Sequence, residues 1–157
     1  MMSRVQKGMV AGLAATTAVS VLEIGNLLLG SPVLAFPALI AELLGMEGNL
    51  MVGWIAHLAI GTLILGGAFG FLYPKLPTYT AATKGIVYAV GAFVVLLVGI
   101  LMFGNPRMFS GADGFGTVGW MLITHAVFGI VLGSVYGTLM AKEKRELKAM
   151  AGAAPAH

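Results

Sequence analysis

Three ionisable residues, Glu23, His57 and His125, lie within long apolar stretches of this sequence. Ionisable residues are costly inside a membrane, and there they mark candidate functional sites by default. Two imidazoles can ligate a haem iron or a metal ion, and a carboxylate can orient an imidazole or act as a third ligand. A proton relay is another interpretation of the set. Hydrogen bonding between helices, with no ligand at all, is the simplest one.

The composition around these residues is that of an integral membrane protein. Of the 157 residues, 59% are hydrophobic and only 10% are charged, whereas soluble domains average about 45–50% and about 25%. The mean hydropathy is +0.96. Such a chain cannot cover a surface that faces water, which excludes a soluble enzyme, a disordered tail and a nucleic-acid binder. The absence of cysteine excludes disulfides, iron–sulfur clusters and Cys-ligated zinc.

Four apolar runs are long enough to cross a bilayer, which takes roughly 20 residues. They predict an all-α, up-down four-helix membrane bundle that forms a single domain over residues 1–157. The predicted spans are residues 8–29, 50–73, 85–104 and 117–140, each bound being approximate. Between the first two spans, Pro37 and Gly45 are typical start and stop residues of a helix. They predict a short helix at about 37–45 on the outer surface, and residues 142–157 are predicted to form a cytoplasmic tail.

The basic residues are concentrated on one side of this predicted topology. Eight of the nine Lys and Arg lie before the first span, after the fourth, or between the second and third, and only Arg107 lies elsewhere. Because Lys and Arg accumulate in cytoplasmic segments, we predict that both termini are cytoplasmic. Trp54 and Trp120 then mark the outer interface. The net charge of +3 reflects this topology and predicts no nucleic-acid partner.

The two halves of the chain resemble each other. A Lys-Gly pair opens both the first and the third span, at residues 7–8 and 84–85. In the second and fourth spans a Gly-Trp pair, a His and a Gly four residues after it recur in the same order: Gly53, Trp54, His57 and Gly61, then Gly119, Trp120, His125 and Gly129. This similarity predicts a duplicated helical hairpin with a pseudo-two-fold axis along the membrane normal.

The predicted depths bring the three ionisable residues to one level. At 1.5 Å per residue, Glu23 lies roughly 9 Å below the outer boundary, and His57 and His125 lie roughly 5 and 8 Å below the tryptophans. The second and fourth spans stand diagonally, roughly 11–14 Å apart if neighbours are 8–10 Å apart, a separation that suits a haem. Gly61 and Gly129, one turn after each histidine, leave space for a flat macrocycle. We therefore expect His57 and His125 to be axial ligands of a haem b, with Glu23 bonded to one imidazole.

Other interpretations of the same residues stay open. A transition-metal ion such as copper, iron or zinc is the alternative cofactor, held by His57, His125 and Glu23. The expected function is that of a cofactor-binding subunit, without catalysis of its own, in electron transfer or in an accessory role within a larger membrane complex. Its expected partners are lipid and other membrane subunits, or further copies of the same chain. A small transporter or channel, or a structural subunit without cofactor, is the alternative function.

Two blocks of the sequence resemble a known family. They are the stretch from Gly53 through His57 and Gly61 to Pro77, and the stretch from His125 through Gly129 to Gly137. Both are similar to segments of a family of small bacterial four-helix membrane proteins of unassigned function. The resemblance implies the topology and supports the two histidines as family features, and it implies no substrate or activity.

Overall fold

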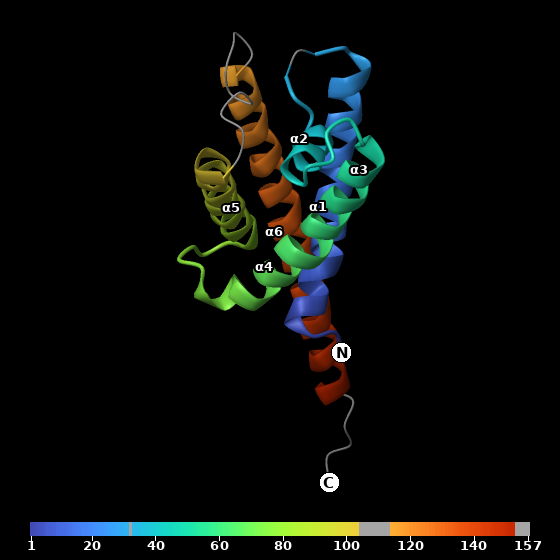
Figure 1. Cartoon of the computed structure of the whole chain (residues 1–157). Helices are drawn as coiled ribbons and strands as arrows, with labels where there is room; N and C mark the ends of the chain where they lie inside the picture. Colours follow the sequence, from blue (N-terminus) through green and yellow to red (C-terminus); the bar gives the residue numbers. More distant parts are fainter. Residues whose placement is uncertain (32, 104–113, 153–157) are drawn as a thin grey trace.

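The computed structural model describes residues 1–31, 33–103 and 114–152, and all regular structure within them is helical (Figure 1). Four helical segments are long and apolar enough to cross a membrane, which confirms the predicted all-α architecture and indicates a multi-pass membrane protein. The first, third and fourth are α1 (Arg4–Leu28), α5 (Ala81–Phe103) and α6 (Gly114–Gly152). The second runs from Leu50 to Lys75 and comprises α3 (Leu50–Ala59), η1 (Ile60–Gly66), α4 (Gly67–Leu72) and η2 (Tyr73–Lys75).

Several helix ends differ from the predicted ones for local reasons. Helix α1 begins at Arg4 because Ser3 and Gln6 form a capping box, in which each side chain accepts a hydrogen bond from the other residue's backbone N–H. Helix α6 continues well past the apolar run to Gly152, so most of the predicted tail is helical. The predicted end of the third span at residue 104, the loop with Arg107, and residues 153–157 lie outside the described residues.

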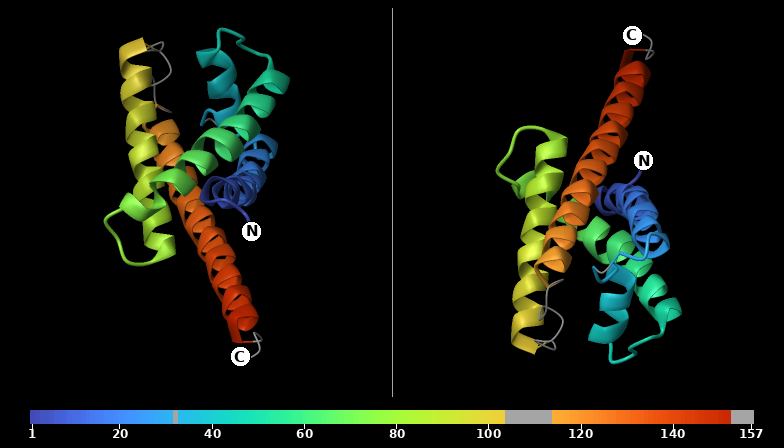
Figure 2. Two further views of the ribbon diagram at one scale, coloured as in Figure 1. Left: turned by 90° about the horizontal axis from the view of Figure 1, so that it is seen from below. Right: turned by 90° about the horizontal axis from the view of Figure 1, so that it is seen from above.

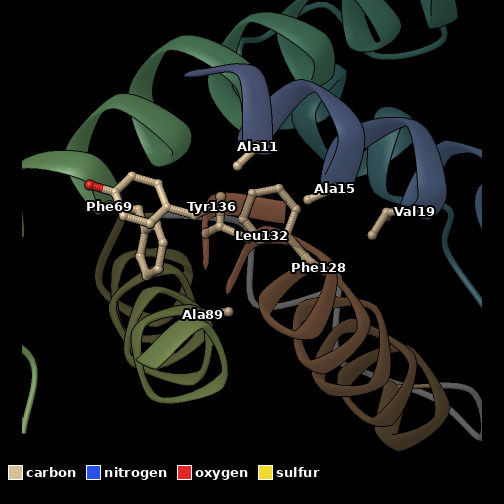
Figure 3. Packing of buried hydrophobic residues seen from close by; sticks show 8 residues of the cluster. All are labelled: Ala11, Ala15, Val19, Phe69, Ala89, Phe128, Leu132 and Tyr136. Atoms are coloured by element: carbon tan, nitrogen blue, oxygen red, sulfur yellow. The ribbon is translucent and has the colours of Figure 1, made fainter. Parts of the chain in front are cut away.

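The long helix α6 connects the two halves of the bundle. It packs against α5 on one side and against α1 on the other, while α1 also packs against η1 and α4 (Figure 2). Where these elements meet, a buried apolar cluster fills the interior (Figure 3). Its members are Ala11, Ala15, Val19, Phe69, Ala89, Phe128, Leu132 and Tyr136. The N-terminal and C-terminal ends of the described chain lie at the same end of the bundle, where Lys7 forms an ion pair with Glu143.

Glycines allow the helices to approach backbone to backbone at two crossings. A Cβ atom at Gly8 of α1 would collide with the backbone of Gly66 and Gly70, and one at Gly85 of α5 would collide with the backbone of Gly129 and Gly133. Small residues at a crossing permit the close van der Waals packing that associates helices in a membrane. The same residue type therefore serves the same purpose in both helix pairs.

The short helix α2 (Phe36–Leu43) forms close to where it is predicted, but it does not lie on the surface. Leu39, Ile40 and Ala41 are buried, and α2 packs against α3, where a Cβ at Gly53 would collide with the carbonyl of Pro37. A helix that is apolar around its whole circumference tends to be buried, and α2 carries only one charged residue, Glu42. The apolar sequence thus draws α2 into the bundle between the spans.

The second span is interrupted by a π-helical segment, η1. The wider hydrogen-bonding pattern of a π-helix changes the partners of the backbone groups around it, and such segments occur frequently at functional sites. Here the hydroxyl of Tyr88 on α5 donates to the carbonyl of Leu65 at 2.9 Å. The segment lies one turn from His57 and includes Gly61, which lines the cavity described next.

Candidate functional site

Two of the three ionisable site residues, His57 and His125, line one small cavity. The cavity has a volume of about 30 Å³ and is lined by both histidines, by Thr16 of α1, by Phe36 of α2 and by Thr124 of α6, among others. The Phe36 ring contacts both imidazoles edge to face, with centroid distances of 5.6 Å to His57 and 5.7 Å to His125. The two imidazoles belong to different spans, and they share one aromatic neighbour and line the same cavity.

The orientation of the His125 ring is fixed by its own helix. Its Nδ1 lies 2.7 Å from the carbonyl oxygen of Met121, one turn earlier in α6. Because a carbonyl can only accept, Nδ1 carries the proton, and Nε2 of the neutral ring has a free lone pair. The ring of Phe93 packs against the imidazole at a centroid distance of 5.6 Å. His125 is thus a buried imidazole with a defined tautomer and an available Nε2.

His57 is held by α1 and by its own helix. Its Nε2 lies 3.2 Å from the hydroxyl oxygen of Ser20, and the Trp54 ring packs edge to face against it at 5.7 Å. The side chain is buried, as is that of His125. The Ser20 hydroxyl can either donate to Nε2 or accept from it, so the tautomer of His57 is not fixed in the way that of His125 is.

Glu23 does not bond to either imidazole. It is completely buried, and its two carboxylate oxygens accept from the backbone N–H of Phe36 and from Nε1 of Trp120, each at 3.0 Å. Its role in the structure is to fix the start of α2 and to connect it to α6. Within the described ranges, no three His, Cys, Asp or Glu side chains are grouped so that they could hold a metal ion. The set of Glu23 with both histidines is therefore not brought together.

The glycines expected to make room for a macrocycle are already in contact with protein. A Cβ at Gly61 would collide with the side chain of Thr16, and a Cβ at Gly129 would lie 2.6 Å from the carbonyl oxygen of Gly85 and 2.9 Å from the Cβ of Ala89. Gly61 does line the cavity, whereas Gly129 belongs to the crossing of α5 with α6. The space that these glycines provide is used for packing one helix against another.

The size of the cavity distinguishes between the haem and the metal ion that the sequence suggests. One water needs roughly 10–15 Å³ by this measure, so a volume of about 30 Å³ has room for two or three water-sized groups. A haem is many times larger, and Phe36 stands against both imidazoles. The residues as arranged do not fit a haem, whereas a single metal ion fits by size.

The polar atoms around the cavity are mainly hydrogen-bond acceptors. The Thr16 hydroxyl donates its proton to the Gly12 carbonyl at 2.7 Å, and the Thr124 hydroxyl donates to the carbonyls of Trp120 and Met121 at 3.0 Å. With their protons engaged, these oxygens offer only lone pairs to the cavity, as does Nε2 of His125. The rest of the lining is largely apolar, with Val19, Ile60, Leu65 and Phe128 among its residues, so the two imidazoles are the main groups that could hold a ligand there.

The sequence did not single out Phe36, although it makes the contact that connects the pair. The only local signal was its place directly before Pro37 at the start of a predicted helix. Trp120 was interpreted as an interfacial marker, whereas its indole N–H is bound to a buried carboxylate. Both roles depend on the insertion of α2 into the bundle.

A model of a protein family, described as a family of unknown function (DUF6789), matches residues 2–147 of the chain. No curated protein and no solved structure matches the chain.

Proposed function

Because the chain belongs to DUF6789, a family of unknown function, we propose its function from its own residues: it binds one transition-metal ion between His57 and His125. The observation that carries this proposal is the convergence of two buried imidazoles, from different spans, on a cavity of ionic size. In this proposal the protein is an accessory subunit of a larger membrane complex and catalyses no reaction by itself.

The donor set favours copper in its monovalent state. Imidazole nitrogens suit copper, zinc, iron and nickel, and ligating histidines usually donate their other ring N–H to a fixed acceptor. The bond from His125 Nδ1 to the Met121 carbonyl has that form. The cavity has no carboxylate in its described lining, and burying charge without a counter-charge is costly. A singly charged ion is therefore favoured over a divalent one.

Metal analysis of variants tests this proposal. The purified protein, reduced and incubated with copper(I) in detergent, is expected to retain about one copper per chain, as two-ligand binding in a single site requires. His57→Ala and His125→Ala should each abolish retention, whereas His157→Ala, which removes the third histidine of the chain, should not. A metal-free wild-type protein, or retention that neither pocket variant changes, would refute the proposal.

A structural subunit without cofactor is the second candidate. The hydrogen bond between Ser20 and His57 and the one from His125 to the Met121 carbonyl support it, because they connect each ring to the protein without any ligand. It predicts a metal-free protein that still folds when either histidine is replaced, since such bonds average about 0.6 kcal/mol in membranes. A haem b remains testable by a Soret band in the absorption spectrum, and its binding would require Phe36 to move away from both rings.

The topology that accompanies this proposal has both termini in the cytoplasm of a bacterium and the metal site in the outer half of the inner membrane. The asymmetry of the basic residues supports it. A duplicated hairpin is also part of the proposal. Its support is that each hairpin has a glycine crossing, Gly8 with Gly66 and Gly70, and Gly85 with Gly129 and Gly133, although the two crossings differ by about one turn from the sequence repeat.

A further inference from the structure

The charged residues that follow the apolar run of α6 border two grooves, and Lys142 lines both of them. Glu143 forms an ion pair with Lys7 of α1, and Glu143 and Glu146 both line a groove on that side. On the side of α5, Lys142 and Arg145 line a second groove of about 590 Å³. The first groove thus contains both acidic and basic residues, whereas the only charged residues in the described lining of the second groove are basic.

The residues at the floor of the second groove are small and uncharged. They include Ala81 at the start of α5 and Ser134, Gly137 and Thr138 of α6. The Thr138 hydroxyl donates to the Ser134 carbonyl at 2.9 Å, and a Cβ at Gly137 would lie 2.6 Å from the Cβ of Ala81. The helices are therefore in contact beneath the groove, and the hydroxyl proton is already engaged.

Lys142 and Arg145 are available to an external anion. Both side chains are exposed, and neither forms a salt bridge with any described residue. Lys142 directly follows the charge-free run that ends at Ala141. Because that run spans the hydrocarbon layer, the two basic groups lie at the level of the lipid head groups, where long basic side chains extend toward the interface.

We propose that this groove binds an anionic phospholipid in the leaflet on the side of the two termini. The lipid phosphate lies between Lys142 and Arg145, and an acyl chain follows the face of α6 that carries Gly137 and Ser134. A guanidinium forms paired hydrogen bonds with phosphate oxygens, and basic pockets between membrane helices bind anionic head groups. The uncharged floor extends into the span, which suits the lower part of a lipid and gives a soluble phosphate nothing to contact.

Lipid titration followed by native mass spectrometry tests the site on the full chain in detergent. Phosphatidylglycerol is the probe, phosphatidylcholine is the neutral comparison, and inorganic phosphate is the soluble competitor. The double variant Lys142→Gln with Arg145→Gln is compared with Lys144→Gln with Lys148→Gln, which removes the same charge from positions that do not line the groove. All four side chains are exposed, so both double variants should fold.

We expect the groove variant to weaken phosphatidylglycerol binding roughly tenfold or more, because two basic contacts to an anionic lipid are lost. The control variant should change that binding clearly less than the groove variant does, because neither Lys144 nor Lys148 lines the groove and only the weaker effect of a nearby exposed charge is lost. Equal weakening in both variants would overturn the proposal, as would equal binding of phosphatidylcholine. Displacement of the lipid by inorganic phosphate would also overturn it, since the site would then belong to a soluble anion.

Discussion

The carboxylate of Glu23 accepts a hydrogen bond from the backbone N–H of Phe36 at 3.0 Å, inside the bundle. This bond connects α1 to the first turn of α2, where a negative charge is favourable because the helix N-terminus carries a partial positive charge. The side chain of the same Phe36 contacts both histidines. Glu23 therefore acts on the histidine pair through the position of α2 and not as a ligand.

Removing this carboxylate should destabilise the fold. Glu23→Gln replaces an oxygen by an NH₂ group, which confronts the N–H of Phe36 or of Trp120 with a second donor. We expect a loss of about 1–3 kcal/mol, the cost of an unsatisfied buried donor, measured as a lower thermal midpoint in detergent. Glu47→Gln, at an exposed position, is the control. A midpoint equal to that of the wild type would show that Glu23 does not hold α2.

Removing the hydroxyl should affect stability differently at Tyr88 and at Tyr136. Tyr88→Phe removes the bond to the Leu65 carbonyl in η1 and should cost about 1 kcal/mol. The hydroxyl of Tyr136 is buried and has no partner among the described residues. Tyr136→Phe should therefore be neutral or stabilising, because it removes an unsatisfied polar group. Chemical denaturation of both variants checks this, and a larger loss for Tyr136→Phe would contradict it.

The crossings of the helices can be tested with single alanines. Gly85→Ala places a Cβ against the backbone of Gly129 and should destabilise the bundle by about 1–3 kcal/mol through overpacking. Gly91→Ala in the same helix meets nothing within 4 Å, and there alanine should be neutral or stabilising because it restricts the unfolded chain. Thermal midpoints of the two variants provide the comparison, and equal midpoints would argue against a tight crossing.

The orientation of the chain can be tested with reporter fusions. The positions of the basic residues predict that a reporter in the segment of residues 76–80 or at His157 is active only on the cytoplasmic side. Paired alkaline phosphatase and fluorescent protein fusions measure this. Labelling of the C-terminus by an impermeant reagent from outside intact cells would show that the chain has the opposite orientation. The histidine pair would then lie in the inner half of the membrane.

The spans could be predicted from the sequence because their signal is local. Three spans are long charge-free runs, the first is interrupted only by Glu23, and the start of α2 carries its own proline. The burial of α2 could not be predicted in this way, because it depends on the contact of Pro37 with Gly53 and on the carboxylate of Glu23. Gly53 lies on α3 and Glu23 lies on α1, so neither contact can be recognised from the sequence of α2.

The correspondence of the two halves was predicted only in part. In the sequence repeat, Gly61 corresponds to Gly129 and His57 to His125. In the helix crossings, Gly66 corresponds to Gly129, because Gly66 contacts Gly8 and Gly129 contacts Gly85. His57 thus lies about one turn farther from its crossing than His125 does from its own. The π-helical η1 runs from Ile60 to Gly66. Within the second span, helix α1 packs mainly against η1 and α4, whereas α2 packs against α3, and Phe36 of α2 contacts both histidines.

X-ray absorption of the copper-loaded protein tests the central claim most directly, because it reports the atoms bound to the metal. Two buried imidazoles around one ion predict two nitrogen donors at about 2.0 Å, with the multiple-scattering pattern of histidine. His125→Ala is expected to retain no copper, because Nε2 of His125 is one of the two donors, so its spectrum should show no bound copper. A first shell of methionine sulfur, or an unchanged spectrum in the variant, would contradict a metal site formed by His57 and His125.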